Sequence, residues 1–366
     1  MNKTTKITIV KALGIIAIVS GHIGPIALAT VLYLYHVPLF FFLSGYLYDE
    51  KYSHNIGQLF KKRIQTLYLP YLLYCLAFLF CRNLFLAIGI YSANPQALFT
   101  MPPFLPNPDG GRVLLKIFGF QYFEPLLVPL WFLPCLIFVN ILFAGIRKVA
   151  LDVDKENAGR FTMFMVLFFA ALGFLCAGLN IQSDLYLDCS LVALIFFFLG
   201  SLYRKHENVI SLKASLAVPA VIGLVFCNRY HEADMFERAY GNPVLYVTCA
   251  LAGIYINFWL ADKLLAYQNK ATELLLIIGR NTLPILALHL LAIKLVSFAR
   301  IVMGDGDILS LVVVNPCEGF GITYYWLFIY TVVGVFVPIG FITALRAVRD
   351  YLSSIILHNR PTAAGK

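Results

Sequence analysis

The sequence has few charged residues for its length. Asp, Glu, Lys and Arg make up 13% of the 366 residues, and apolar types make up 60%. A soluble domain has about 25% charged and about 45–50% apolar residues. So few charges cannot coat a compact soluble body with this much apolar surface. The composition therefore excludes an ordinary soluble enzyme, a disordered tail protein and a secreted disulfide scaffold, and it leaves a polytopic membrane protein.

The sequence also lacks the motifs of several enzyme classes. It contains no phosphate-binding P-loop, no dinucleotide fingerprint, no His-Glu-x-x-His helix and no Gly-x-Ser-x-Gly elbow. Its eight cysteines form no Cys-x-x-Cys pair and show no zinc spacing with histidine. The calcium-like run GDGD at 304–307 is followed by leucines where calcium needs oxygen ligands. We therefore expect no metal site and no bound cofactor.

Long apolar runs indicate spanning helices, which need about 20 mostly apolar residues each. They do not alternate in the manner of barrel strands. The sequence predicts an all-α polytopic transmembrane helix bundle, with one membrane-embedded domain at 1–345 and a short basic tail at 346–366. About ten spans are expected, at residues 7–24, 29–48, 65–90, 126–146, 161–179, 187–203, 213–228, 243–261, 282–303 and 322–345.

The basic residues predict the orientation of these spans. With the N-terminus in the cytoplasm, 20 of the 28 Lys and Arg residues fall in inner segments and only 4 in outer loops. Positive charge gathers on the cytoplasmic side of membrane proteins. Both termini are therefore expected to be cytoplasmic, and the net charge of +9 needs no nucleic acid partner. The proline-rich outer connection at 91–125 is expected to form a lid or wall over an acceptor site.

Several ionisable side chains lie inside the predicted spans, where each costs roughly 2.5–3.5 kcal/mol at the bilayer centre. Lys11 and His22 are 11 residues apart and therefore share one face of the first helix. His36 lies just before Pro38, which predicts a kinked or irregular second span. His289 lies in the ninth span. Imidazole is suited to proton transfer near neutral pH, although packing histidines and a snorkelling lysine are alternatives.

A run of three cations, Lys61, Lys62 and Arg63, occupies the loop expected before the third span. Three cations at a membrane entrance suit a phosphate-rich ligand. They equally suit anchoring at the inner face or an anionic membrane lipid. Ser44 and Gly45 lie further along the second span, where a glycine allows helices to pack closely.

Five motifs stand in order along the chain: Lys11 with Gly21–His22, YHVPLFFFLSGYLY at 35–48, KKR at 61–63, LWFLPCLI at 130–137 and GRNTLPILALH at 279–289. Taken together, they resemble the acyltransferase family 3 of integral membrane proteins, closest to its polysaccharide O-acetyltransferase, fucose 4-O-acetyltransferase-like branch. The resemblance covers nearly the whole chain. Two positions depart from the family pattern: Thr8 stands where the family often has an acid, and Thr66 stands where many members have the second arginine of Arg-x-x-Arg.

The resemblance implies transfer of an acetyl group from cytoplasmic acetyl-CoA, a donor substrate, to a hydroxyl of a cell-surface or lipid-linked glycan such as an O-antigen. The expected location is a bacterial cytoplasmic (inner) membrane. His22 is expected to act as a general base or as a transient acetyl carrier. The predicted catalytic residues are His22, His36 and His289, and the predicted substrate-binding residues are Lys11, Lys61, Lys62, Arg63, Ser44, Trp131 and Asn281.

Two alternatives remain open at this point. A glycan exporter or flippase without acyl transfer would need an aqueous path and usually a repeat architecture, and the sequence shows no internal repeat. The same transfer with another donor, such as succinyl-CoA, would favour an additional buried cation, which Lys294 or Arg300 would provide. Cleavage of the thioester by the purified protein separates the enzyme from the exporter.

Overall fold

The computed structural model describes residues 3–93, 110–122, 124–210, 212–228, 233–267 and 269–358. Within these ranges the chain is helical and forms no strand, apart from an isolated backbone bridge between Asp234 and Ala239. Nine stretches of helix in the described chain are long and apolar enough to cross a membrane. The predicted all-α transmembrane architecture is confirmed.

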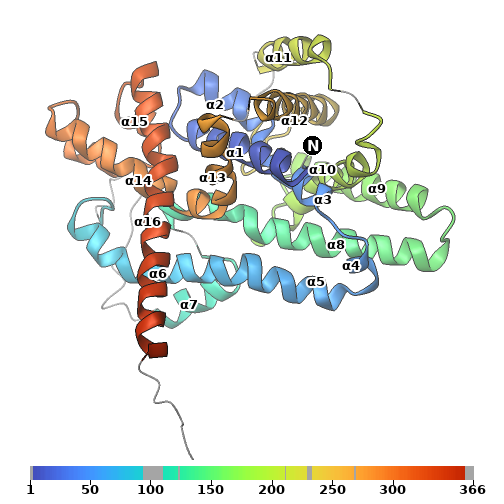
Figure 1. Ribbon diagram of the computed structural model, residues 1–366, viewed down its shortest axis with the longest axis horizontal. Coiled ribbons are helices and arrows are strands. Elements are labelled where there is room, and N and C mark those ends of the chain that lie inside the picture. Colours follow the sequence, from blue (N-terminus) through green and yellow to red (C-terminus); the bar gives the residue numbers. More distant parts are fainter. Residues whose placement is uncertain are drawn as a thin grey trace, which may run out of the picture.

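The helices follow one another in an order that Figure 1 shows by colour. Residues 94–109 of the predicted lid and 359–366 of the predicted tail lie outside the described residues. The elements are α1 (Lys3–Gly21), α2 (Ile26–Tyr33), α3 (His36–Tyr46), α4 (Lys51–His54), α5 (Ile56–Arg63), the π-helical turn η1 (Ile64–Tyr68), α6 (Leu69–Ala87), α7 (Gly110–Phe118), the 3-10 segment η2 (Pro125–Trp131), α8 (Phe132–Val153), α9 (Ala158–Gly178), α10 (Leu187–His206), α11 (Ala214–Asn228), α12 (Pro243–Leu265), α13 (Lys270–Arg280), α14 (Thr282–Val302), the 3-10 turn η3 (Ile308–Leu311), α15 (Pro316–Gly319) and α16 (Tyr324–His358).

Nine of the about ten predicted spans coincide with helices of the described chain that are long and apolar enough to cross a membrane, and the seventh, residues 213–228, forms a shorter apolar helix. This segment forms α11, which has 15 residues. At about 1.5 Å per residue it is shorter than the hydrocarbon core of about 30 Å. The chain nevertheless changes ends here, because α10 and α12 both finish beside the start of α1. Lys3 pairs with Glu207 (3.0 Å) and Lys6 pairs with Asp262 (2.9 Å).

The start of α1 defines one end of the bundle, called here the N-terminal end. Gly279 of α13 packs on the backbone of Thr8, where an added Cβ would lie 1.9 Å from the carbonyl oxygen. Arg346 of α16 donates a hydrogen bond to Asn281, next to α13 (3.4 Å). The residues around Arg346 therefore lie at the same end of the bundle as the start of α1. Helix α16 continues to His358, so helix extends into the segment predicted as a tail.

Helix α1 lies among α3, α12, α13, α14 and α16, and it is the central helix of the bundle (Figure 1). Its residues Ile9, Val10 and Ala12 are completely buried. A helix that is apolar nearly all round needs neighbours on every side. The polar side chains of α1 therefore face protein or a cavity rather than lipid.

The second predicted span is broken, as expected from Pro38. Helix α2 ends at Tyr33 and α3 starts at His36, with Pro38 in the first turn of α3. Proline has no N–H to continue the hydrogen bonds of the preceding turn. The break frees backbone carbonyls, and the His36 ring takes one of them, the Leu32 carbonyl (2.7 Å). The break thus fixes the position of a predicted site histidine.

Close packing of α3 on α10 requires two glycines. A Cβ at Gly45 would lie 1.8 Å from the carbonyl oxygen of Phe197, and a Cβ at Gly200 would lie 1.9 Å from that of Phe42. No side chain fits at either position without moving the backbone. The predicted role of Gly45 in helix packing is confirmed.

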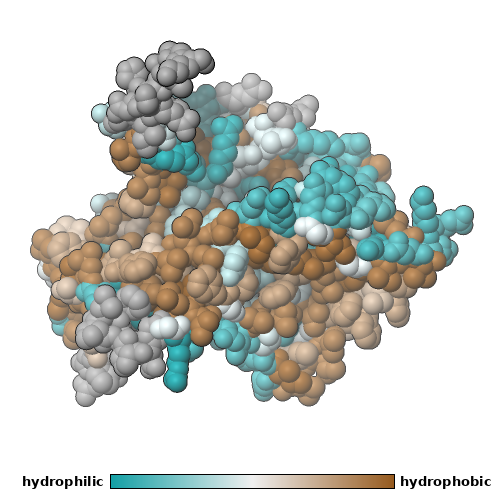
Figure 2. Space-filling model, turned by 90° about the horizontal axis from the view of Figure 1, so that it is seen from below, coloured by the Kyte–Doolittle hydropathy of each residue, from teal (hydrophilic) through white to brown (hydrophobic). Residues whose placement is uncertain are grey.

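The outer surface is largely apolar. Figure 2 shows a broad apolar belt across the face that it presents, with a large group of hydrophilic residues above the belt and smaller groups below it. Helices α6 and α9 expose large apolar side chains, including Phe80 and Phe164. Exposed apolar area of this extent is typical of a surface that contacts lipid.

Candidate functional site

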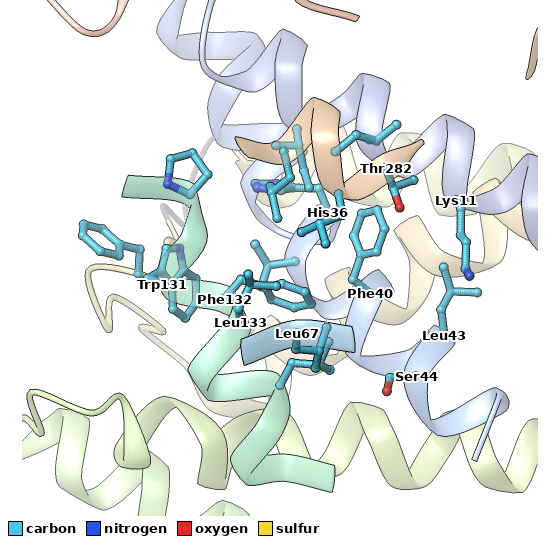
Figure 3. A pocket seen from close by; sticks show the side chains of 18 of the residues that line it. Lys11, His36, Phe40, Leu43, Ser44, Leu67, Trp131, Phe132, Leu133 and Thr282 are labelled. Carbon is cyan, nitrogen blue, oxygen red and sulfur yellow. The ribbon is translucent and has the colours of Figure 1, made fainter. Parts of the chain in front are cut away.

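One cavity of about 530 Å³ brings most of the predicted site residues together. It lies between α1, α3, α5, η2, α8, α14 and the loop before α12. In the view of Figure 3, Trp131 lies toward one end and Lys11 and Ser44 lie toward the other, with His36 and Phe40 between them. Seven of the ten predicted residues line it, namely Lys11, His22, His36, Ser44, Lys62, Arg63 and Trp131.

Helix α1 presents a straight stripe to this cavity. Lys11, Ile15, Ile18 and His22 all line it, and their spacing of 4, 3 and 4 residues is that of one helix face. The prediction that Lys11 and His22 share a face is confirmed. At about 1.5 Å per residue they lie roughly 16 Å apart along the axis. The cavity therefore extends from near the N-terminal end of the bundle toward the opposite end.

His22 forms a pair with His289, which is completely buried behind it. The Nε2 atom of His289 lies 3.3 Å from Nδ1 of His22. The Nδ1 atom of His22 also lies 2.9 Å from the Ile18 carbonyl oxygen, and that of His289 lies 3.0 Å from the carbonyls of Ile285 and Leu286. A carbonyl oxygen only accepts, so we assign a proton to both Nδ1 atoms.

This assignment fixes the roles of the remaining ring nitrogens. Nε2 of His289 has a lone pair, and it accepts from Nδ1–H of His22, which the Ile18 carbonyl shares. Nε2 of His22 then keeps its own lone pair. Because His22 lines the cavity, this nitrogen is available as a base there. His289 does not line the cavity itself, and it acts on the cavity only through His22.

A tyrosine connects the histidines. The Tyr33 ring lies 6.1 Å from the His22 ring and 5.0 Å from the His36 ring, between centroids. Nδ1 of His36 donates to the Leu32 carbonyl, so Nε2 of His36 also carries a lone pair. Tyr33 was not among the predicted site residues, because one tyrosine in an aromatic-rich span gives no signal of its own.

The opposite end of the cavity is cationic. Arg63 donates to the Asn140 side chain (2.6 Å), and Asn140 in turn donates to Ser44 (3.3 Å). The buried Nε atom of Arg63 has no partner among the described residues. Lys62 donates to the Tyr52 hydroxyl (3.0 Å). Over the described chain, no carboxylate lines this end and none pairs with Lys11.

Asn140 is a second residue that sequence reasoning missed. It is completely buried in α8, where it also donates to the Leu136 carbonyl (2.7 Å). One amide within a long apolar helix resembles a packing residue in the sequence. Its position between Arg63 and Ser44 is set only by the contact of α8 with α3 and α5.

Two predicted binding residues, Lys61 and Asn281, do not line the cavity. Lys61 is exposed, because the expected loop is the last turn of helix α5 and Lys61 faces away. Asn281 bonds the Ile277 carbonyl (2.8 Å) and Arg346, although the next residue, Thr282, does line the cavity.

The two cations considered for a succinyl donor are also occupied elsewhere. Lys294 donates to the carbonyls of Leu311 (2.7 Å) and Val313. Arg300 donates to Asp305 (2.8 Å). Neither lines the cavity. Both hold the segment after α14 in place.

The far end of the cavity combines aromatic rings with a carboxylate. Trp131, Phe236 and Asp234 all line it. The Trp131 and Phe236 ring centroids are 5.7 Å apart. Asp234 was not predicted, because its loop reaches the cavity only in three dimensions. Over the described residues, no group of three His, Cys, Asp or Glu side chains is placed to hold a metal ion.

The comparisons with known proteins give one match. Residues 5–345 match the family of the acyltransferase domain (family 3), which is nearly the whole chain. No curated protein and no solved structure is significantly similar to the chain. The chain therefore belongs to the acyltransferase family 3. Membership and the nine apolar helices together make it a multi-pass membrane acyltransferase.

Proposed function

We propose that the protein transfers an acetyl group from acetyl-CoA to a hydroxyl of a cell-surface or lipid-linked glycan. The observation that carries this proposal is the polarity of one cavity. Unpaired cations lie at one end, and a histidine with a free ring nitrogen lies some three helical turns away. An anionic donor needs the cations at its binding end, and a hydroxyl acceptor needs a base at the other end.

The donor binds at the cationic end. Phosphate groups of CoA suit Arg63 and Lys62, because a guanidinium and an ammonium form strong charge-assisted hydrogen bonds. The guanidinium of Arg63 lines the cavity, and its hydrogen bond to Asn140 (2.6 Å) holds it in place there. Between the two ends the lining is apolar and includes Ile15, Ile18 and Phe40, which suits the uncharged arm that carries the thioester.

His22 performs the proton transfer. Its Nε2 takes the proton from the acceptor hydroxyl while the hydroxyl oxygen attacks the thioester carbonyl. The new C–O bond forms as the C–S bond breaks, and the leaving CoA sulfur takes the proton from His22. His289 accepts a hydrogen bond from Nδ1–H throughout, which stabilises the imidazolium that forms.

The sidedness follows from the position of the cations. The cationic end of the cavity lies near the N-terminal end of the bundle, where Tyr46 of α3 donates to Glu207 (2.8 Å) and Lys3 pairs with the same carboxylate. The excess of Lys and Arg in the segments expected at this end favours the cytoplasm. The donor then enters from the cytoplasm of a bacterial inner membrane, and the acceptor binds from the outside.

The test is acetyl transfer by the purified protein in lipid, measured as CoA release and as the mass of the glycan product. His22→Ala is expected to lose roughly 100-fold or more of the turnover. His206→Ala is the matched control, because His206 makes the same ring-to-backbone bond (3.0 Å) on an exposed site outside the cavity. Undiminished activity in His22→Ala would show that His22 is not the general base. A wild type that cleaves no thioester would favour the exporter, and a succinylated product would correct the donor.

A further inference from the structure

The loop before α12 holds one carboxylate rigidly at the cavity. Asp234 and Ala239 exchange two backbone hydrogen bonds of 2.9 Å, which close a tight turn. Met235, inside the turn, is buried. A turn that is closed at its base and packed at its centre keeps its side chains in place without a ligand. Asp234 is therefore preorganised rather than loosely exposed.

The cation in this turn is committed elsewhere. Arg238 donates to Asp188 at the start of α10 (2.9 Å) and to the Ser183 carbonyl (3.2 Å). Its guanidinium also lies over the Tyr186 ring, 5.0 Å from the centroid. Asp234 consequently has no ion pair among the described residues, whereas the buried Glu124 pairs with Arg82 (2.8 Å).

Within the described part of the chain, the partners of the Asp234 carboxylate are backbone groups. Its carboxylate accepts from the N–H groups of Phe236 (2.7 Å) and Glu237. Burial raises the pKa of this carboxyl above its ordinary value. A carboxylate has about four lone-pair positions, so positions remain free toward the cavity. Neutral hydrogen-bond donors such as hydroxyls would fill these positions without bringing a further charge into the site.

Aromatic rings flank this carboxylate. Trp131 lies 5.7 Å from Phe236 and 5.5 Å from Tyr186, between ring centroids. Trp131 and Phe236 share the cavity wall with Asp234. A pyranose has an apolar face of C–H groups and an edge of hydroxyls. A ring wall beside a hydroxyl-accepting carboxylate matches both surfaces of such a sugar.

The geometry points to a specific acceptor subsite: Asp234, Trp131 and Phe236 bind a neutral sugar, with two neighbouring hydroxyls on the carboxylate and the apolar face on the rings. This inference rests on the proposed function and narrows its substrate class. A uronic or sialic acid would bring a second carboxylate to Asp234, with no described cation at that end of the cavity to neutralise it.

The experiment compares wild type, Asp234→Asn and a matched control, Glu237→Gln. Glu237 is an exposed carboxylate in the same turn that does not line the cavity. The acceptor probe is envelope glycan isolated from cells that lack the gene. Three quantities are measured: binding of CoA, the KM and kcat for the glycan, and the sugar residue that gains the acetyl group, located by fragmentation.

In the expected result, Asp234→Asn raises the glycan KM roughly tenfold or more and leaves CoA binding unchanged, because an amide accepts fewer hydroxyl hydrogen bonds than a carboxylate. Glu237→Gln behaves as wild type, and the acetyl group is on a neutral sugar. An unchanged KM, a parallel loss of CoA binding, or acetylation of an acidic sugar overturns the inference while acetyl transfer stands. A wild type that transfers no acetyl group overturns the proposed function as well.

Discussion

Replacing His289 tests whether the histidine pair works as a unit. In His289→Leu, Nδ1–H of His22 loses its 3.3 Å contact with Nε2 of His289 but keeps the 2.9 Å bond to the Ile18 carbonyl. The protonated ring nitrogen of His22 therefore stays the same, and Nε2 of His22 keeps its lone pair. What is lost is one hydrogen bond to the charged imidazolium that forms during transfer.

The size of the effect follows from that difference. A hydrogen bond to a charged group is worth about 1.5–3 kcal/mol, so kcat is expected to fall roughly 10- to 150-fold. This is well below the loss of about 10⁴ in serine proteases whose catalytic histidine takes the wrong tautomer. His289→Gln is expected to keep part of the rate, because its amide oxygen is an acceptor near the same place.

The assay is CoA release at saturating donor and acceptor, with KM for the donor measured in parallel. Ser297→Ala is the matched control on α14, since Ser297 is buried and bonds Tyr330 (3.0 Å) away from the cavity. If His289→Leu is as fast as wild type, His289 does not assist His22 in the transfer. A loss larger than that of His22→Ala would instead make His289 the base.

Three further outcomes are expected. Gly45→Ala should lower the thermal unfolding midpoint in detergent, because the added Cβ clashes with α10 at a cost of about 1–3 kcal/mol. Gly145→Ala, which has open space at its Cβ, should leave the midpoint unchanged, and equal midpoints for the two variants would contradict the packing of α3 on α10. Arg63→Gln should raise the KM for acetyl-CoA roughly tenfold and leave that for acetyl-pantetheine unchanged, with Lys61→Gln as the silent control; equal effects on both donors would place the phosphates elsewhere. The glycan KM should rise as pH falls through the raised pKa of Asp234, because protonation removes the carboxylate, and Asp234→Asn should lack this limb of the profile.

The sequence predicted what local periodicity controls. A spacing of 11 residues determines a shared helix face, so the common orientation of Lys11 and His22 could be derived before any packing was known. Proline removes a donor wherever it stands, so the break near Pro38 was equally predictable. Both features appear in the structure as expected.

The sequence did not predict what depends on helix rotation or on distant contacts. Lys61 and Lys62 are neighbours in the chain, but successive residues of a helix are turned by about 100°, and only Lys62 reaches the cavity. Asn140 acquires its role from contacts with Arg63 and Ser44, which lie far from it in sequence. Asp234 lies at the cavity without an ion pair because the cation of its turn, Arg238, bonds Asp188 of α10 instead.

The pairing of cations separates structural from functional charge in this bundle. Outside the cavity, the buried and half-buried cations of the described chain pair with carboxylates or bond carbonyls. Among the described residues, the cavity cations Lys11, Lys62 and Arg63 have no carboxylate partner, and for the half-buried Lys11 and Arg63 an uncompensated charge is costly. A ligand that brings several negative charges removes that cost when it binds, which is why these three positions fit the donor. The paired or carbonyl-bonded cations are Lys6, Arg82, Arg147, Arg238, Lys294 and Arg300.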